Sequence, residues 1–355
     1  MNTGSRLRQV WTIARLQLRR VFFSRRSFWV YLLAFFPAVI FFMHGLQVKF
    51  MQTNWADQIT PASVLELIHE GDTDEEFLGR AGKPLNENTY THKHDDKETT
   101  CRYLQFFDGE RRWYLQFRDG AFFSVRSRLL IDFNEDRETF AAVFHHFYLR
   151  LGIFFGCLGI FMNLFRGEML DKTLHYWFLA PMRREVLLTG KYLAGLIAAV
   201  VIFTAGTLTC YAIMLWPQDS AVFDAFWQDH GPAHAFWYAA SAAMGCIGYG
   251  SVFLAAGLLL RNPIVPAIVI LLWESVNGIL PAALQKLSVL YYVQSLAPVP
   301  LPIDPSAPLL IRLLLAPAEP PSVAVAVLGL LGVTVLVLWI ASRTVRRLEI
   351  DYGTD

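Results

Sequence analysis

Apolar residues gather in six long stretches of this chain and are sparse between them. Each stretch is close to the length of about 20 residues that an α-helix needs to cross the apolar core of a bilayer. The stretches cover residues 27–47, 141–165, 187–216, 233–260, 263–283 and 321–341. The pattern therefore predicts an all-α polytopic membrane protein with six transmembrane helices.

Positive residues mark one side of these predicted spans. Arginine or lysine precedes the first span, lies between spans two and three and between spans four and five, and follows the sixth. The loop 217–232 holds three aspartates and no positive residue. Because Lys and Arg near span ends stay in the cytoplasm, we expect both termini there and residues 48–139 and 284–320 outside. No small-x-small cleavage site follows residues 27–43, so we expect an uncleaved first span and not a signal peptide.

The basic start of the chain has the periodicity of a helix with one apolar face. That face carries Leu7, Val10, Trp11, Ala14, Leu18, Val21 and Phe22, and arginines line another. We expect residues 1–26 to form a cytoplasmic amphipathic helix in the inner headgroup layer, in contact with membrane lipids. The alternative is a solvated positive flank.

Residues 48–139 form a polar block between the first two spans, with 18 acidic and 12 basic residues. Residues 61–79 have a helical pattern, and strand patterns follow at 101–107, 113–117 and 121–125. Asp108-Gly109 and Asp119-Gly120 separate these strands as turn pairs. The block is predicted to be a small α+β extracytoplasmic insert, with an antiparallel meander packed under two short helices.

Prolines interrupt the segment before the last span. Seven of them lie between Pro298 and Pro320, which excludes a continuous helix there. The apolar run 309–315 is too short to span, so we expect a short outer-leaflet or re-entrant helix in the extracytoplasmic segment 284–320.

Composition narrows the classes of function. The chain of 355 residues is 54% hydrophobic and 17% charged, with a net charge of +1, which argues against an ordinary soluble enzyme and against nucleic acid as a partner. Four cysteines give no disulfide framework or zinc spacing. His92-Lys93-His94 has no second ligand cluster, so a solvated loop is favoured over a metal site. Residues 79–84 lack the spacing of a phosphate-binding loop, so we expect no cofactor bound by this chain.

The most informative segment joins spans two and three. Glu168 and Lys172 have the spacing of a helix-supporting ion pair, and an apolar stripe of Leu170, Leu174, Trp177 and Phe178 accompanies them. Pro181 ends this helix, and Lys191 is expected to snorkel back to the headgroups. Residues 166–186 are therefore predicted to form a short amphipathic helix and loop at the cytoplasmic surface. It either docks in a partner's groove or rests on the bilayer.

This segment resembles the cytoplasmic loop of permease subunits of ABC-2-type transporters. The resemblance rests on Glu168, the step Lys172-Thr173-Leu174, Pro181, Arg183-Arg184 and Gly190-Lys191. The amphipathic start, the six spans and the Pro-rich outer loop match the same family over residues 1–47 and 140–345. Lys172 departs from the small residue that usually precedes Thr-Leu in the family, and the insert 48–139 is not general to it.

The resemblance implies a permease that works as a homo- or heterodimer in the inner membrane of a bacterium. ATP and Mg would be bound by a separate cytoplasmic ATP-binding subunit, and this chain would not be an enzyme. The 166–184 loop would be the coupling helix, through which ATP-driven closure of the partner moves the spans and exports a substrate. The coupling residues so implied are Glu168, Lys172, Thr173, Leu174, Trp177, Pro181, Arg183 and Arg184.

Three polar residues within the spans are further candidates, because intramembrane polar groups often serve function. Glu274 and Asn277 share one face of the fifth predicted span, and Arg150 lies in the second with His145 and His146. Glu274 and Asn277 either line a translocation path or subunit seam or form a buried hydrogen bond between helices. Arg150 is expected to snorkel to the outer surface.

A second hypothesis comes from a different class of function. The chain would be a membrane-anchored sensor or assembly factor, whose extracytoplasmic domain binds a partner while the spans only hold it. Both hypotheses share one predicted organisation. The cytoplasmic helix 1–26 is followed by span one (27–47), the extracytoplasmic insert 48–139 and span two (140–165). The cytoplasmic loop 166–186, spans three to five (187–283), the Pro-rich segment 284–320, span six (321–342) and the cytoplasmic tail 343–355 come after them.

Overall fold

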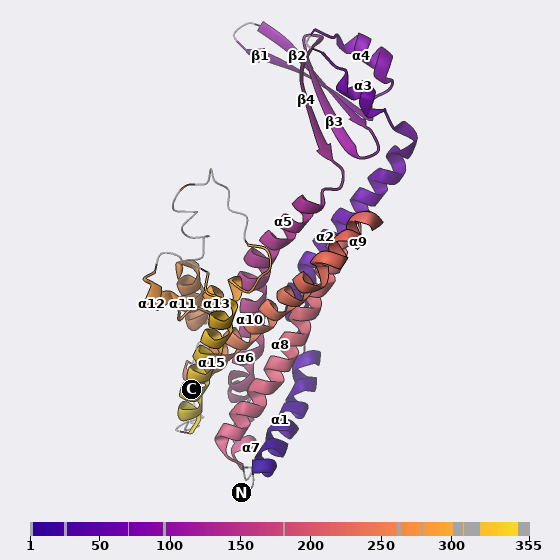
Figure 1. The fold of residues 1–355 in the computed structure, drawn as a ribbon. Helices are drawn as coiled ribbons and strands as arrows, with labels where there is room; N and C mark the ends of the chain where they lie inside the picture. Colours follow the sequence, from indigo (N-terminus) through magenta and orange to yellow (C-terminus); the bar gives the residue numbers. More distant parts are fainter. Residues whose placement is uncertain are drawn as a thin grey trace. The chain divides into compact units, whose positions relative to one another are not determined.

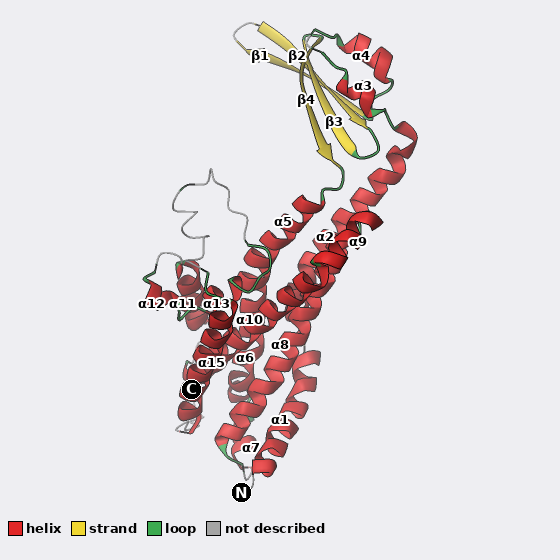
Figure 2. Cartoon of the chain, viewed as in Figure 1, coloured by secondary structure: helices red, strands yellow, loops and turns green. Residues whose placement is uncertain are grey.

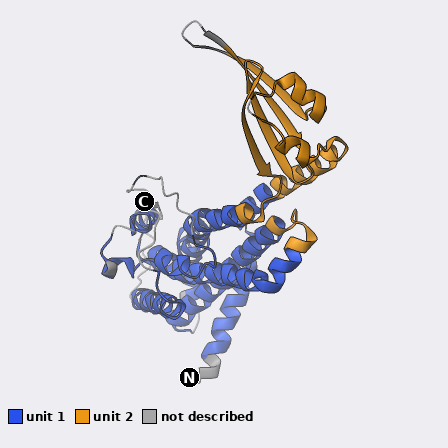
Figure 3. Cartoon of the chain, turned by 45° about the horizontal axis from the view of Figure 1, so that its top comes forward, with its two compact units in different colours: residues 1–41, 137–213, 223–355 blue, residues 42–136, 214–222 orange. Residues whose placement is uncertain are grey.

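The computed structural model is mostly helical, with one four-stranded antiparallel sheet (Figures 1 and 2). It describes residues 3–24, 27–69, 71–94, 97–179, 182–260, 264–277, 280–300, 308 and 320–346. The chain divides into two compact units (Figure 3). The helical unit comprises residues 1–41, 137–213 and 223–355, and the sheet unit comprises residues 42–136 and 214–222.

Within the described residues, five helical segments are long and apolar enough to cross a membrane. They support a membrane-embedded protein and coincide with five of the six predicted spans. The segments are α2 (Ser27–Trp55, extended by η1, Ala56–Gln58), the continuous run of α5 (Phe133–Val143), η2 (Phe144–Gly152) and α6 (Ile153–Leu170), then α8 (Arg184–Leu215), α10 (Gly231–Leu259) and α15 (Val323–Arg346).

The predicted fifth span, 263–283, differs from the structure. Its helix α11 (Ile264–Ser275) has 12 residues, a length of about 18 Å, which is too short to cross a bilayer. The chain continues into two short helices, α12 (Ala282–Gln285) and α13 (Val289–Gln294). The prediction counted the apolar residues of 263–283 as one continuous helix. Pro281 interrupts that stretch, because it is the N-cap of a new helix, α12.

The side chain of Glu274 stabilises this short arrangement. Its carboxylate is buried and accepts hydrogen bonds from the backbone N–H groups of Val289 (3.0 Å) and Leu290 (3.2 Å) and from the Ser288 hydroxyl. Glu274 thus satisfies the free N–H groups at the start of α13. The helix expected over residues 309–315 lies outside the described residues.

Close helix packing in the helical unit depends on small residues. α6 and α10 contact each other extensively, and a Cβ atom at Gly257 of α10 would lie 3.1 Å from the Cα of Met162 on α6. A Cβ at Gly206 of α8 would lie only 2.4 Å from the carbonyl oxygen of Ala34 on α2. Any side chain at Gly257 would push the two backbones apart, so a small residue is needed for this close approach.

The sheet unit contains the predicted meander, with strand order β1-β2-β3-β4. The strands are β1 (Asn86–His94), β2 (Lys97–Phe107), β3 (Arg111–Arg118) and β4 (Ala121–Leu129), and the short helices are α3 (Ala62–Glu66) and α4 (Asp74–Ala81). The two helices cover one face and bury Leu65, Phe77, Leu104, Phe106, Trp113, Leu115 and Phe117. The sequence did not predict β1, because its polar residues lack apolar alternation.

Both Asp-Gly pairs form the predicted turns. Asp119 (φ +50°) and Gly120 (φ +81°) join β3 to β4 in the left-handed region that a two-residue hairpin turn needs. Gly109 (φ +105°) lies in the turn between β2 and β3. Asp108 holds that turn, because its carboxylate accepts hydrogen bonds from the N–H groups of Arg111 (2.6 Å) and Glu110 (2.9 Å). It also accepts one from the indole of Trp113 (2.7 Å).

We expect Asp108→Ala to destabilise the β2–β3 hairpin by about 2 kcal/mol, because three hydrogen bonds to a carboxylate are lost. Partial burial acts to raise the pKa of Asp108, but hydrogen bonds from Arg111, Trp113 and Glu110 outweigh it, and the pKa lies below the ordinary 3.8. The carboxylate therefore stabilises the hairpin at neutral pH, and this contribution is lost as the pH falls below about 3.8. Hydrogen exchange of peptides from the hairpin in the full chain measures both effects. Equal protection of parent and variant at neutral pH would contradict this role.

Candidate functional site

The end of α6 determines where the predicted coupling loop begins. The helix stops at Leu170, and the N–H groups of Lys172 and Thr173 turn back to the carbonyls of Met169 (3.2 Å) and Glu168 (2.9 Å). These two bonds form a Schellman motif, whose penultimate residue adopts a left-handed conformation. Lys172 occupies that position with φ +54°. The loop therefore leaves the span through a fixed turn.

The predicted ion pair between Glu168 and Lys172 does not form in the structure. Lys172 lies beyond the last helical residue, so the i, i+4 geometry that the prediction assumed is absent. The next helix, α7, covers Leu174–Leu179, with Leu174 fully buried. Pro181 lies outside the described residues. α8 starts at Arg184, where the N–H of Val186 donates to the Arg183 carbonyl (3.0 Å).

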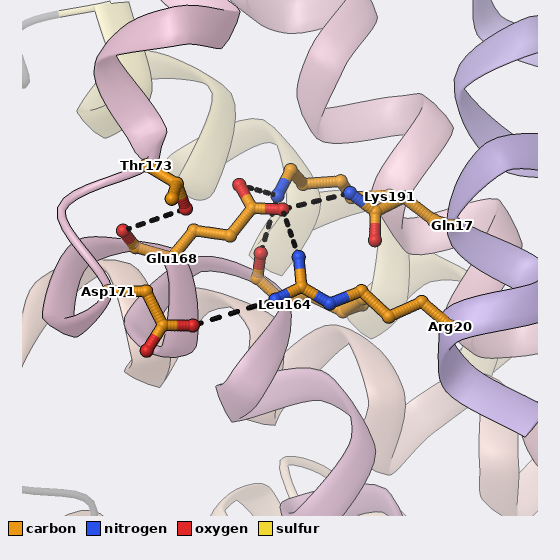
Figure 4. A network of polar contacts seen from close by, with 7 residues as sticks. All are labelled: Gln17, Arg20, Leu164, Glu168, Asp171, Thr173 and Lys191. Atoms are coloured by element: carbon orange, nitrogen blue, oxygen red, sulfur yellow. Dashed lines mark hydrogen bonds and ion pairs between the residues drawn. The ribbon is translucent and has the colours of Figure 1, made fainter. Parts of the chain in front are cut away.

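Glu168 instead pairs with Lys191, the residue expected to snorkel toward the headgroups. The distance from Lys191 Nζ to Glu168 Oε2 is 2.5 Å, and Nζ also donates to the carbonyl of Leu164 at 2.5 Å (Figure 4). Lys191 has no exposed surface and Glu168 has 3%. The snorkelling prediction for Lys191 is therefore wrong: the amine points inward, and the pair connects α6 with α8.

The N-terminal helix α1 (Thr3–Phe23) contributes to the same network. Gln17 is buried and donates to Glu168 Oε1 at 2.9 Å. Arg20 lies 3.6 Å from Glu168 Oε1 and 3.5 Å from Asp171 Oδ2, and Figure 4 shows its guanidinium between these two carboxylates. One carboxylate thus connects three helices that are distant in sequence.

Gly190 explains how α1 can approach so closely. A Cβ atom at Gly190 would lie 2.8 Å from Cβ of Ile13 and 3.1 Å from the carbonyl oxygen of Val10. Ile13 and Ala14 are buried, whereas Leu7 and Trp11, which belong to the predicted apolar face, remain exposed. The amphipathic helix is thus present, and one side of it packs on the bundle. Its place in the headgroup layer stays a prediction.

Aromatic rings surround the amine of Lys191. Its Nζ lies 4.8 Å from the ring centroid of Phe165 on α6 and 5.7 Å from that of Trp177 on α7. Both distances are within the range of a cation–π attraction, which is stronger in a desolvated site. Trp177 therefore ties α7 to the same charge that joins α6 and α8.

Arg184 has a contact that the sequence did not indicate. Its guanidinium donates to the carbonyls of Arg346 (3.1 Å) and Val345 (3.4 Å) at the end of α15. The neighbouring Glu185 forms an ion pair with Arg346. These contacts cap the free carbonyls of the last span and attach it to the start of α8.

The intramembrane candidates lie apart from this network. Glu274 caps α13, a buried hydrogen-bonded role that the sequence left open as an alternative. Asn277 has a buried Oδ1 without a hydrogen-bond partner among the described residues. Arg150 lies in the π-helical η2 and is half-buried, and the His145 ring of the same segment contacts the Val299 carbonyl at 3.0 Å.

A cavity of about 240 Å³ adjoins the network between α1, α2 and α6. Its lining includes Gln17, Arg20, Ser24, Asn163 and Glu168. Among the residues that the structure describes, no group of three or more His, Cys, Asp or Glu side chains could hold a metal ion. The site is a buried, charged network that links α1, α6 and α8.

Comparison with protein-family models, with curated proteins and with solved structures gives no match to this chain. The resemblance to ABC-2 permeases therefore stays a prediction from the sequence. Sequence reasoning found Glu168, Thr173, Leu174 and Trp177 but missed Gln17 and Arg20. The one sequence signal for these two residues was the small Gly190 beside Lys191, which is compatible with a helix packing closely on α8.

We expect Lys172→Gly to stabilise the chain by about 1 kcal/mol, because a non-glycine residue in the left-handed region is strained. Lys172→Ala is the matched control: it removes the amine but keeps the Cβ atom, and it should not stabilise. Denaturant unfolding of the purified chain, with hydrogen exchange of the loop peptide, measures the difference. Identical behaviour of the two variants would show that the turn does not constrain stability.

Proposed function

We propose that this chain is the permease subunit of an ATP-driven ABC-2-type transporter, with α7 as its coupling helix. The observation that carries the proposal is the buried Glu168–Lys191 pair, which joins the two spans on either side of the loop. A coupling helix must pass force to the spans, so it needs a rigid connection to them. The Schellman turn on one side and the Lys191–Trp177 contact on the other supply that connection.

The free surface of α7 suits a partner's groove. Leu174 faces the bundle, whereas Tyr176 and Leu179 are 67% and 78% exposed, and Leu170 at the end of α6 is 63% exposed. Apolar side chains grouped at a protruding loop are typical of a docking site for a second protein. The proposed occupant is the ATP-binding subunit, which would bring ATP and Mg.

The network suggests how movement passes from the loop to the spans. A push on α7 acts on α6 through the turn at Lys172, on α8 through Lys191, and on α1 through Glu168, Gln17 and Arg20. Three helices would therefore tilt together. In this proposal the protein works as a dimer in a bacterial inner membrane, with both termini in the cytoplasm. It exports a hydrophobic or amphipathic substrate.

We expect the double variant Tyr176→Ser/Leu179→Ser to weaken docking of the ATP-binding subunit by about tenfold or more, as loss of exposed anchor residues does at other interfaces. The measurement is the ATPase activity of the co-purified partner with and without this chain. The matched control is Leu67→Ser, which removes a side chain of similar exposure (59%) from the sheet unit.

A deletion separates this proposal from the sensor hypothesis. Trp55 and Ile131 both pack against the cluster of Val48, Phe107 and Leu130, so the ends of residues 57–130 lie near each other and a short Gly-Ser linker can replace that segment. The permease proposal expects ATPase stimulation to survive the deletion and to be lost in the loop variant. Stimulation that is unchanged by the loop variant would refute it.

A further inference from the structure

One face of the sheet has no helix of the described part of the chain packed over most of its area. Side chains alternate between the two faces of a strand, and α3 and α4 cover the face that carries Leu104, Phe106, Trp113 and Leu115. The opposite face is here called the open face, and the described residues that cover it pack near Phe107, which contacts Val48 and Leu130.

The open face combines arginine, tyrosine and side-chain amides. Its tyrosines, Tyr90, Tyr103 and Tyr114, are 57%, 41% and 40% exposed and lie on three neighbouring strands. No acidic residue occupies this face at any strand position that the structure describes. Its arginines and side-chain amides are Arg112, Arg118, Arg126, Arg128, Asn86, Asn88, Gln105 and Gln116.

The arginines are placed at a cost to the sheet itself. Arg112 and Arg128 are direct partners across β3 and β4, and like charges in that position destabilise a sheet. Glu135 pairs with Arg128, but Nε of Arg112 is buried without a hydrogen-bond partner among the described residues. Arg126, opposite Tyr114, is exposed. The cluster therefore holds more positive charge than its surroundings neutralise.

Charge and shape together select the kind of ligand. A second copy of the open face would bring arginines against arginines, so self-association through it is disfavoured. Arginine forks recognise carboxylate or phosphate groups, and flat side-chain amides match the paired hydroxyls of sugars. Exposed tyrosine rings can stack on the apolar C–H faces of sugar rings. An acidic peptide would form ion pairs with the arginines but would make fewer contacts with the side-chain amides and the tyrosine rings.

We propose that the open face binds an anionic glycan, with Arg112, Arg126 and Arg128 holding the acidic groups and Tyr114 and Tyr103 stacking on the sugar rings. This site is independent of the proposed transport function, because it lies wholly within the sheet unit. It gives the insert a ligand of its own.

The test is binding of fluorescent polygalacturonate oligosaccharides to the full-length chain in phosphatidylcholine nanodiscs. We expect saturable binding that weakens with added salt, and no binding of neutral dextran. Arg126→Gln and Tyr114→Ala should each weaken binding by about tenfold, the effect of losing one charge-assisted or anchoring contact. Tyr114→Phe should retain binding, because the ring is kept. Arg111→Gln, one residue from Arg112 but on the other face, should have no effect.

Several outcomes would overturn the proposal. One is that the parent chain does not bind polygalacturonate. Another is that the Arg126→Gln and Tyr114→Ala variants bind it as tightly as the parent chain does. Polyglutamate binding as tightly as polygalacturonate, with no loss in Tyr114→Ala, would assign the face to acidic peptides instead. Hydrogen-exchange protection of the β2–β3 hairpin is the control for folding. In a variant whose protection is unchanged, a loss of binding supports the proposed site.

Discussion

The arrangement of the cytoplasmic end of the helical unit depends on one buried ion pair, Glu168 with Lys191. Taking two charges out of water costs several kcal/mol per ion, so such a pair persists only when further hydrogen bonds satisfy it. Here the Leu164 carbonyl accepts from the amine, and Gln17 donates to the carboxylate. Each of these partners comes from a defined position on α6 or α1. The electrostatic requirement therefore fixes how α1, α6 and α8 meet.

This requirement also explains the local sequence. Gly190 precedes Lys191 because α1 lies too close to α8 for a side chain at that position. Trp177 brings α7 against the same amine, and Thr173 closes the turn on the carbonyl of Glu168. The loop is thus attached to the bundle at both of its ends.

Features that depend on neighbours in sequence could be predicted, and features that depend on distant residues could not. Five spans, both Asp-Gly turns and the helical start of the chain follow from local patterns. The partner of Glu168 could not be predicted, because Lys172 is close in sequence while Lys191 is close only once two helices have packed. The same holds for α11, where Glu274 caps α13 from 15 residues away. Strand β1 joins the sheet by backbone pairing, which its polar sequence does not reveal.

The most direct test of this account is a double-mutant cycle of Lys191→Met and Glu168→Gln, with unfolding of the purified chain and partner ATPase stimulation as readouts. Lys191→Met leaves the buried Glu168 carboxylate with only the longer Arg20 contact as a countercharge, and Glu168→Gln leaves the Lys191 amine buried without one. Each single variant should therefore cost about 3–5 kcal/mol in the free energy of unfolding. The double variant removes both charges and should recover most of that loss, with ATPase stimulation following the same order. Strictly additive losses would contradict the account, since they would mean that the two side chains act independently.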